Sequence, residues 1–130
     1  MRINFLLAGS VAGALAVAAG ALGAHALEPL IEARRLEAFE TAVRYQFYHV
    51  FALLAVHLLG NGQRQSLLHR AGLLFLWGMA LFSGSLYVLS TQEVTGLQAS
   101  FLGPVTPLGG LLLILGWIQL AYYAGKTKWQ

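Results

Sequence analysis

Charged side chains are distributed so unevenly along this chain that they restrict it to one kind of fold. Every Lys, Arg and Glu falls outside four long stretches, which are residues 3–27, 45–63, 71–92 and 94–125. A helix needs roughly 20 apolar residues, at about 1.5 Å each, to cross a hydrocarbon core of about 30 Å. Backbone polar groups must be paired within lipid, so such continuous apolar stretches predict membrane-spanning helices.

The fourth stretch is too long for one crossing, and two prolines in residues 103–107 divide it. We therefore expect an all-α integral membrane four-helix bundle, a single transmembrane domain over residues 1–130. Its spans are predicted at about 3–27, 45–63, 71–92 and 108–125, with a Pro/Gly loop at 103–107. The first apolar run is longer than the 7–15 residues usual in a secretory signal, so we expect it to stay uncleaved.

Composition excludes several other classes of protein. Hydrophobic residues make up 58% of the chain and charged residues only 10%, whereas a soluble domain has about 25% charged residues. Too little charge remains to cover a water-facing surface or to bind nucleic acid through basic patches. The chain has no cysteine, which removes disulfides and thiolate metal sites. We expect the lipid bilayer as its surroundings and no nucleic-acid partner.

The basic residues predict how the chain is oriented, because short cytoplasmic loops carry an excess of Lys and Arg. An N-terminus inside places five basic residues on the inner side: Arg2, Arg64, Arg70, Lys126 and Lys128. Only three then lie outside: Arg34, Arg35 and Arg44. The five-to-three excess predicts that both termini are cytoplasmic.

Residues 28–44 form the one charge-rich segment, and they precede the second span. Leu36, Phe39 and Val43 recur at helical spacing opposite Glu37 and Glu40, which indicates an amphipathic helix. Such a helix could lie on the outer membrane surface or present a docking surface. It could instead be a solvated extension of the second span, which is the interpretation we favour.

The first span carries a small residue at every fourth position. This ladder consists of Ala8, Ala12, Ala16, Gly20 and Ala24. Small side chains let helix backbones approach closely in lipid. The ladder therefore predicts a packing face, either against another span of the same chain or, alternatively, at the seam of a homodimer.

Polar residues from separate parts of the chain are predicted to reach one depth, in the outer halves of the spans. They are His25, Gln46, His49, Ser83, Ser85, Tyr87 and Thr106. Polar groups at membrane depth are costly and usually face the bundle interior or water. The plain interpretation is that they hydrogen-bond one another and fix the packing of the helices. The functional hypothesis is an outward-facing cluster that binds a small ligand, a lipid or a partner subunit.

Other activities find less support in the sequence. His25 and His49 are the residue type that ligates haem iron or a metal, so a haem- or quinone-linked redox subunit is one alternative. A small oligomeric transporter or channel is another, although the first span lacks the carboxylate that small four-helix exporters use. We expect no catalytic residue, no bound metal and no cofactor, and so a non-enzymatic protein.

Several blocks of residues occur in a familiar order. They are residues 23–27 (GAHAL), 45–49 (YQFYH), 81–87 (LFSGSLY), 103–110 (GPVTPLGG) and 116–117 (GW). In these blocks the chain closely resembles the YgdD/YwdK-like family of small bacterial inner-membrane proteins, over essentially its whole length. The resemblance implies a four-span protein of the bacterial inner membrane. It brings no established activity, substrate or catalytic residue.

Overall fold

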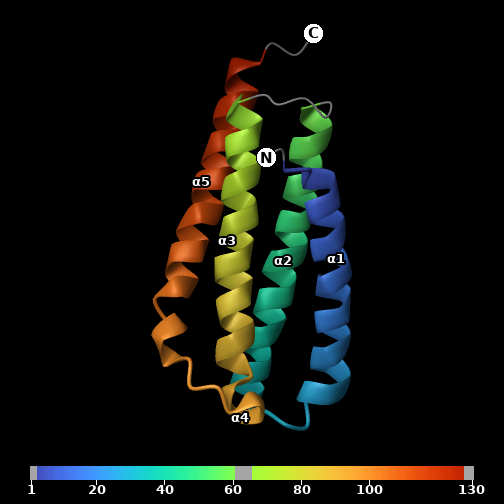
Figure 1. Cartoon of the computed structure of the whole chain (residues 1–130), viewed down its shortest axis with the longest axis vertical. Helices are drawn as coiled ribbons and strands as arrows, with labels where there is room; N and C mark the ends of the chain where they lie inside the picture. Colours follow the sequence, from blue (N-terminus) through green and yellow to red (C-terminus); the bar gives the residue numbers. More distant parts are fainter. Residues whose placement is uncertain (1–2, 61–65, 128–130) are drawn as a thin grey trace.

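The computed structural model describes residues 3–60 and 66–127, and every regular element within them is helical. Four long helices run up and down side by side (Figure 1). In chain order the elements are α1 (Phe5–Leu22), the π-helix η1 (Gly23–Leu27), α2 (Ala33–Leu59), α3 (Ser66–Ser90), α4 (Gln92–Thr95), the 3₁₀-helix η2 (Ser100–Leu102) and α5 (Val105–Lys126). Four helical stretches are long and apolar enough to cross a membrane. The predicted all-α, four-span fold is confirmed.

Both described ends of the chain lie at the end of the bundle opposite α4 (Figure 1). An even number of crossings requires this arrangement. At the α4 end, residues 28–32 connect η1 to α2, and residues 91–104 connect α3 to α5. The predicted polar cluster belongs to this half of the bundle.

Two helices begin earlier than their uncharged stretches. α2 begins at Ala33 rather than at residue 45, so the charged segment from residue 33 to 44 continues directly into the second span. α3 begins at Ser66, ahead of Arg70. The absence of charge marks only the part of a helix that lipid surrounds, whereas helical hydrogen bonding continues into water. Residues 61–63 of the expected second span lie outside the described residues.

The Pro/Gly loop is shorter than the sequence predicts. α5 begins at Val105, with Pro104 as its N-cap, so Thr106 and Pro107 lie in its first turn and not in a loop. The first four N–H groups of a helix have no partner inside it. A proline there removes no hydrogen bond, and it therefore does not delay the start of the helix.

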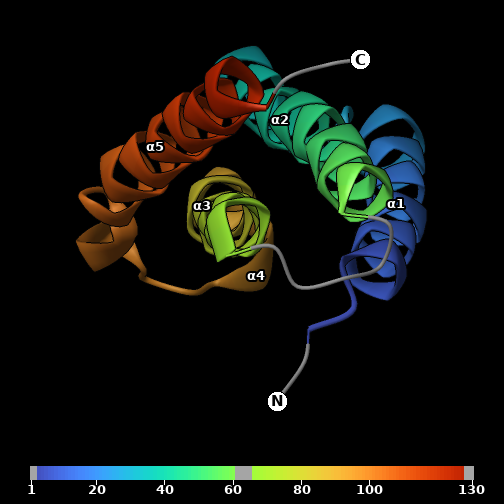
Figure 2. The same ribbon diagram turned by 90° about the horizontal axis from the view of Figure 1, so that it is seen from above.

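α2 and α3 form the centre of the bundle. α1 packs on α2, and α5 packs on α3; seen from above, α5, α2 and α1 curve around α3 (Figure 2). Phe75, Leu53 and Leu68 are the largest apolar side chains that are fully buried. A second, smaller core of Leu27, Ile31 and Phe39 lies at the α4 end. The outward faces of α1 and α5 remain apolar and exposed.

The small-residue face of α1 packs against α2 of the same chain. A Cβ added to Gly13 would lie 3.5 Å from a methyl group of Val50, and one added to Gly20 would lie 3.6 Å from a methyl group of Val43. Of the predicted ladder, Ala12 and Ala16 are buried, Ala8 and Gly20 are half-buried, and Ala24 is exposed. Ala24 leaves the interface because it lies in the π-helix η1, whose wider turns break the four-residue repeat.

α3 and α5 approach each other still more closely, and glycines permit it. A Cβ on Gly109 would lie 2.8 Å from the Cα of Phe82. A Cβ on Gly78 would lie 2.7 Å from Leu113 Cδ2. Neither position can hold a larger residue without moving a helix. These contacts fix the first turn of α5, and with it Thr106, against α3.

Candidate functional site

Six of the seven predicted site residues form hydrogen bonds, most of them between helices, in the half of the bundle nearest α4. They are Gln46, His49, Ser83, Ser85, Tyr87 and Thr106, which we call the polar cluster. They come from α2, α3 and α5, and one of their partners is a backbone carbonyl of α1. His25 is the exception: it lies exposed in η1, and no hydrogen bond to another described residue reaches its side chain.

Gln46 joins three helices. Its amide Nε2 donates to the carbonyl oxygen of Ala12 on α1 at 2.7 Å. Its Oε1 accepts from the Tyr87 hydroxyl on α3, also at 2.7 Å. Gln46 is only 8% exposed, so these bonds replace the water that its amide gives up.

Two serines of α3 make the remaining connections. Ser83 Oγ donates to the carbonyl oxygen of Ala42 on α2 at 2.8 Å. Ser85 Oγ donates to the Phe82 carbonyl within its own helix at 3.0 Å and lies 2.6 Å from Thr106 Oγ1 on α5. A hydroxyl has one proton to give, so the Thr106 hydroxyl is the donor toward Ser85. α3 is thereby bonded to both of its neighbours.

His49 is held at both ring nitrogens. Nδ1 lies 2.7 Å from the carbonyl oxygen of Tyr45, and Nε2 accepts from the Trp117 indole N–H at 3.1 Å. A carbonyl can only accept and an indole N–H can only donate, so His49 is neutral with its proton on Nδ1. Neither nitrogen has a lone pair left for a metal or haem iron in this arrangement. The described residues contain no group of three or more metal-ligating side chains.

Trp117 was not among the predicted site residues. It lies on α5 and is 48% exposed, yet its ring packs against two buried rings. Its ring centroid lies 5.1 Å from that of Phe75 and 6.0 Å from that of His49. An indole N–H at membrane depth has no water to bond. That requirement is a sequence signal that would have predicted a polar partner on a neighbouring helix.

Gln119, toward the C-terminal end of α5, was also not among the predicted site residues. It lies on α5, and its amide Nε2 is buried without a hydrogen-bond partner among the described residues. An unpaired amide in an apolar environment costs roughly 1–3 kcal/mol. Gln119 is therefore an energetically unfavourable position and not a member of the polar cluster.

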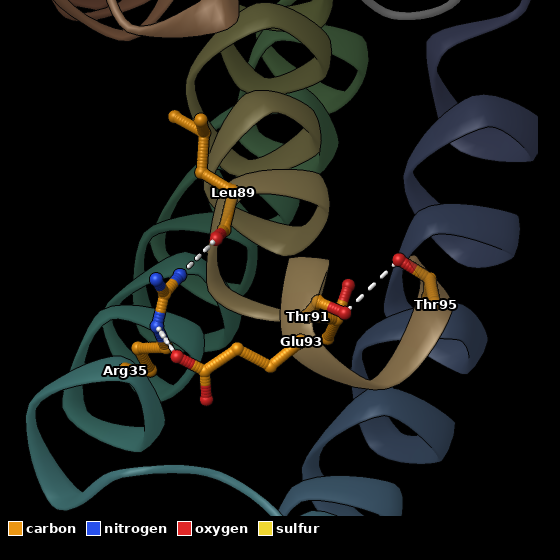
Figure 3. Close-up of polar contacts among 5 residues, drawn as sticks. All are labelled: Arg35, Leu89, Thr91, Glu93 and Thr95. Atoms are coloured by element: carbon orange, nitrogen blue, oxygen red, sulfur yellow. Dashed lines mark hydrogen bonds and ion pairs between the residues drawn. The ribbon is translucent and has the colours of Figure 1, made fainter. Parts of the chain in front are cut away.

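At the α4 end of the bundle, an ion pair connects α2 to α4. Arg35 on α2 places Nε 2.9 Å from Glu93 Oε1 on α4 and donates from Nη1 to the Leu89 carbonyl at 2.9 Å (Figure 3). Thr95 adds a bond to the Thr91 carbonyl within the same turn (Figure 3). The charged N-terminal part of α2 thus holds the connection between α3 and α5.

A groove of about 230 Å³ lies between α1 and α2, next to the polar cluster. Its lining is Gly20, Gly23, Phe39, Glu40, Val43 and Arg44, which we call the outer groove. The two glycines come from α1 and η1, and the charged side chains come from α2. Phe39 packs on the Tyr87 ring at 4.9 Å between centroids, so one wall of the groove rests directly on the polar cluster.

Comparison with known proteins identifies the family. A family model described as "Protein of unknown function (DUF423)" matches residues 19–110. The chain belongs to this family. The membrane protein YwdK of Bacillus subtilis is 41% identical over 127 residues, which are 94% of this chain and 96% of the relative. No solved structure matches the chain.

Other members of the family are equally full-length matches. A membrane protein of Haemophilus influenzae is 36% identical over 129 residues, 98% of each chain. The membrane protein SSP2132 of Staphylococcus saprophyticus is 37% identical over 116 residues, 89% of this chain and 92% of the relative. All three carry the name UPF0382 membrane protein. Membership in a family of membrane proteins agrees with the four helices that can cross a bilayer.

Proposed function

We propose that this chain is a non-enzymatic protein of the bacterial inner membrane that binds a membrane lipid in the outer groove. The observation that carries the proposal is the groove itself, a space of about 230 Å³ with apolar walls and two charged side chains, Glu40 and Arg44. A lipid presents the same combination, an acyl chain and a charged headgroup. The names of the relatives include no enzyme activity.

The polar cluster has a supporting role in this proposal. Gln46 and His49 already use both of their polar ends within the chain, and the hydroxyls of Ser83 and Tyr87 each donate to a residue of another helix. A ligand there would have to displace these bonds, whereas the outer groove is open. The cluster holds α1, α2 and α3 in the arrangement that forms the groove.

The basic residues predict that both termini of the chain are cytoplasmic. In that orientation the depth of the groove in the membrane fits a bound lipid. Gly20 faces Val43, and Gly23 faces Phe39. These pairs lie roughly 15–18 residues along α1 and η1 from Phe5, so about 25 Å from the start of α1. With the N-terminus inside, that distance supports a position for the groove near the outer boundary of a hydrocarbon core about 30 Å thick.

The experiment is native mass spectrometry of the protein purified from bacterial membranes in mild detergent. Gly20→Leu fills the outer groove from α1, because only open space and the Val43 methyl group stand before it. We expect the fraction of protein that retains a phospholipid to fall about tenfold. Ala18→Leu, on the exposed face of α1, adds the same side chain outside the groove and should retain the lipid.

A second variant protects the test from a folding defect. Val43→Phe fills the same space from α2 and should reduce lipid retention in parallel with Gly20→Leu. Circular dichroism and gel filtration verify that each variant remains helical and monodisperse. Lipid retention unchanged in both folded variants would overturn the proposal, as would an equal loss in Ala18→Leu.

A further inference from the structure

We infer that the outer groove selects a phospholipid whose headgroup carries a primary ammonium, of the phosphatidylethanolamine class. The inference rests on the proposed function, since it assigns the headgroup of a lipid bound there. It comes from two opposite charges that line the groove one helical turn apart. Glu40 and Arg44 stand four residues apart on α2.

These two charges do not neutralise each other. Their spacing is the one at which a Glu and an Arg on a helix commonly pair, yet the ion pair in the described residues joins Arg35 to Glu93 instead. Arg44 turns to Thr41, whose Oγ1 accepts from Nη2 at 3.0 Å. Both residues are exposed. The groove therefore offers one cation and one anion, each still able to bind.

Arg44 is held in place for an anionic partner. The Thr41 hydroxyl that accepts its hydrogen bond donates in turn to the Glu37 carbonyl at 2.9 Å. The remaining N–H groups of the guanidinium are not bonded to any described residue, and a guanidinium binds phosphate through paired N–H donors. Arg44 thus provides the contact to the phosphodiester that every phospholipid has.

Glu40 provides the contact that distinguishes one headgroup from another. No hydrogen bond from another described side chain reaches its carboxylate. A primary ammonium has three N–H donors to give to it, whereas the trimethylated nitrogen of choline has none and glycerol carries no charge. Side chains four apart on a helix have Cβ atoms about 5–6 Å from each other, close enough for a two-carbon ethanolamine linker to bridge.

The apolar part of the groove's lining matches the acyl chain of the lipid. Phe39 and Val43 form an apolar wall opposite Gly20 on α1 and Gly23 in η1. An acyl chain would lie along this wall.

The test places the protein in nanodiscs of equal parts phosphatidylethanolamine, phosphatidylcholine and phosphatidylglycerol and identifies the lipids that it retains in native mass spectra. We expect phosphatidylethanolamine to exceed phosphatidylcholine by about fivefold, the scale of one partly exposed ionic contact. Glu40→Gln should bring that ratio to about one. Glu37→Gln, on the exposed surface of α2 outside the groove, should leave it unchanged.

Arg44→Gln separates the phosphate contact from the ammonium contact. It should lower retention of all three lipids about equally, while Arg34→Gln, an exposed arginine outside the groove, should not. Equal retention of the three lipids by the natural protein would overturn the headgroup assignment and leave the groove a lipid site. Retention that Gly20→Leu and Val43→Phe do not reduce would instead overturn the proposed function.

Discussion

The hydrogen bond between Tyr87 and Gln46 offers the sharpest test of how the polar cluster holds the bundle. Tyr87→Phe keeps the ring that packs on Phe39 and removes only the hydroxyl. It leaves Gln46 Oε1 without a partner in a residue that is 8% exposed. Hydrogen bonds between membrane helices contribute about 0.6 kcal/mol on average and up to about 1.7. Because this bond is short and buried, we expect a loss of about 1–1.5 kcal/mol.

A double-mutant cycle isolates that bond from other effects. Gln46→Leu removes two hydrogen bonds, to Tyr87 and to Ala12, and should cost about 2 kcal/mol. The double variant should be more stable than the sum of the two losses predicts, by about 1 kcal/mol. Tyr48→Phe is the matched control, since Tyr48 is 56% exposed, and should change stability by less than about 0.5 kcal/mol.

The assay is equilibrium unfolding in mixed micelles of a mild detergent and sodium dodecyl sulfate, followed by helical circular dichroism. A coupling energy within about 0.3 kcal/mol of zero, the error of additivity for independent sites, would refute the reasoning. It would mean that the two side chains do not stabilise the fold through each other. A loss in Tyr48→Phe as large as in Tyr87→Phe would have the same meaning.

Three further substitutions test other parts of the bundle in the same unfolding assay. Gly109→Ala should destabilise by about 1–3 kcal/mol because its Cβ would meet the backbone of α3, whereas Gly110→Ala, which has ordinary contacts, should change little. Gln119→Leu should stabilise by about 1 kcal/mol, since it removes a buried unpaired amide. Arg35→Gln should cost at most about 1 kcal/mol, because its ion pair with Glu93 is partly exposed.

Each of these has an outcome that would contradict it. A tolerated Gly109→Ala would mean that α3 and α5 are farther apart than the structure has them. A destabilising Gln119→Leu would mean that the amide has a partner. A loss in Arg35→Gln well above 1 kcal/mol would show that the ion pair is shielded from water.

The sequence predicts the number and order of the spans well. In lipid a single segment can pair all of its backbone polar groups only as a helix. It predicts the ends of helices poorly. The charges of residues 33–44 and Arg70 mark where lipid ends, but α2 and α3 continue past them. Pro107 suggested a loop, and its place in the first turn of α5 depends on where the helix begins, which tertiary contacts at Gly109 decide.

The same distinction holds for the candidate site. Gln46 and Tyr87 could be placed at one depth from sequence, because depth follows from position along a span. Which polar groups meet depends on the rotation of each helix, and that is set by packing. His25 was therefore grouped with residues to which, among the described residues, it forms no hydrogen bond, and Trp117 was left out although it donates to His49. The outer groove had no sequence signal, since it arises from two glycines facing a neighbouring helix.

The most direct measurement is the accessibility of single cysteines, which the chain allows because it has none of its own. Glu32→Cys and Gln98→Cys lie at the α4 end, and Ser66→Cys and Gly125→Cys lie near the opposite end, all at exposed positions. A membrane-impermeant maleimide should label the first two in intact spheroplasts and the last two only after permeabilisation. Labelling of one residue from each pair, or of the last two alone, would contradict the four crossings or the outward position of the groove.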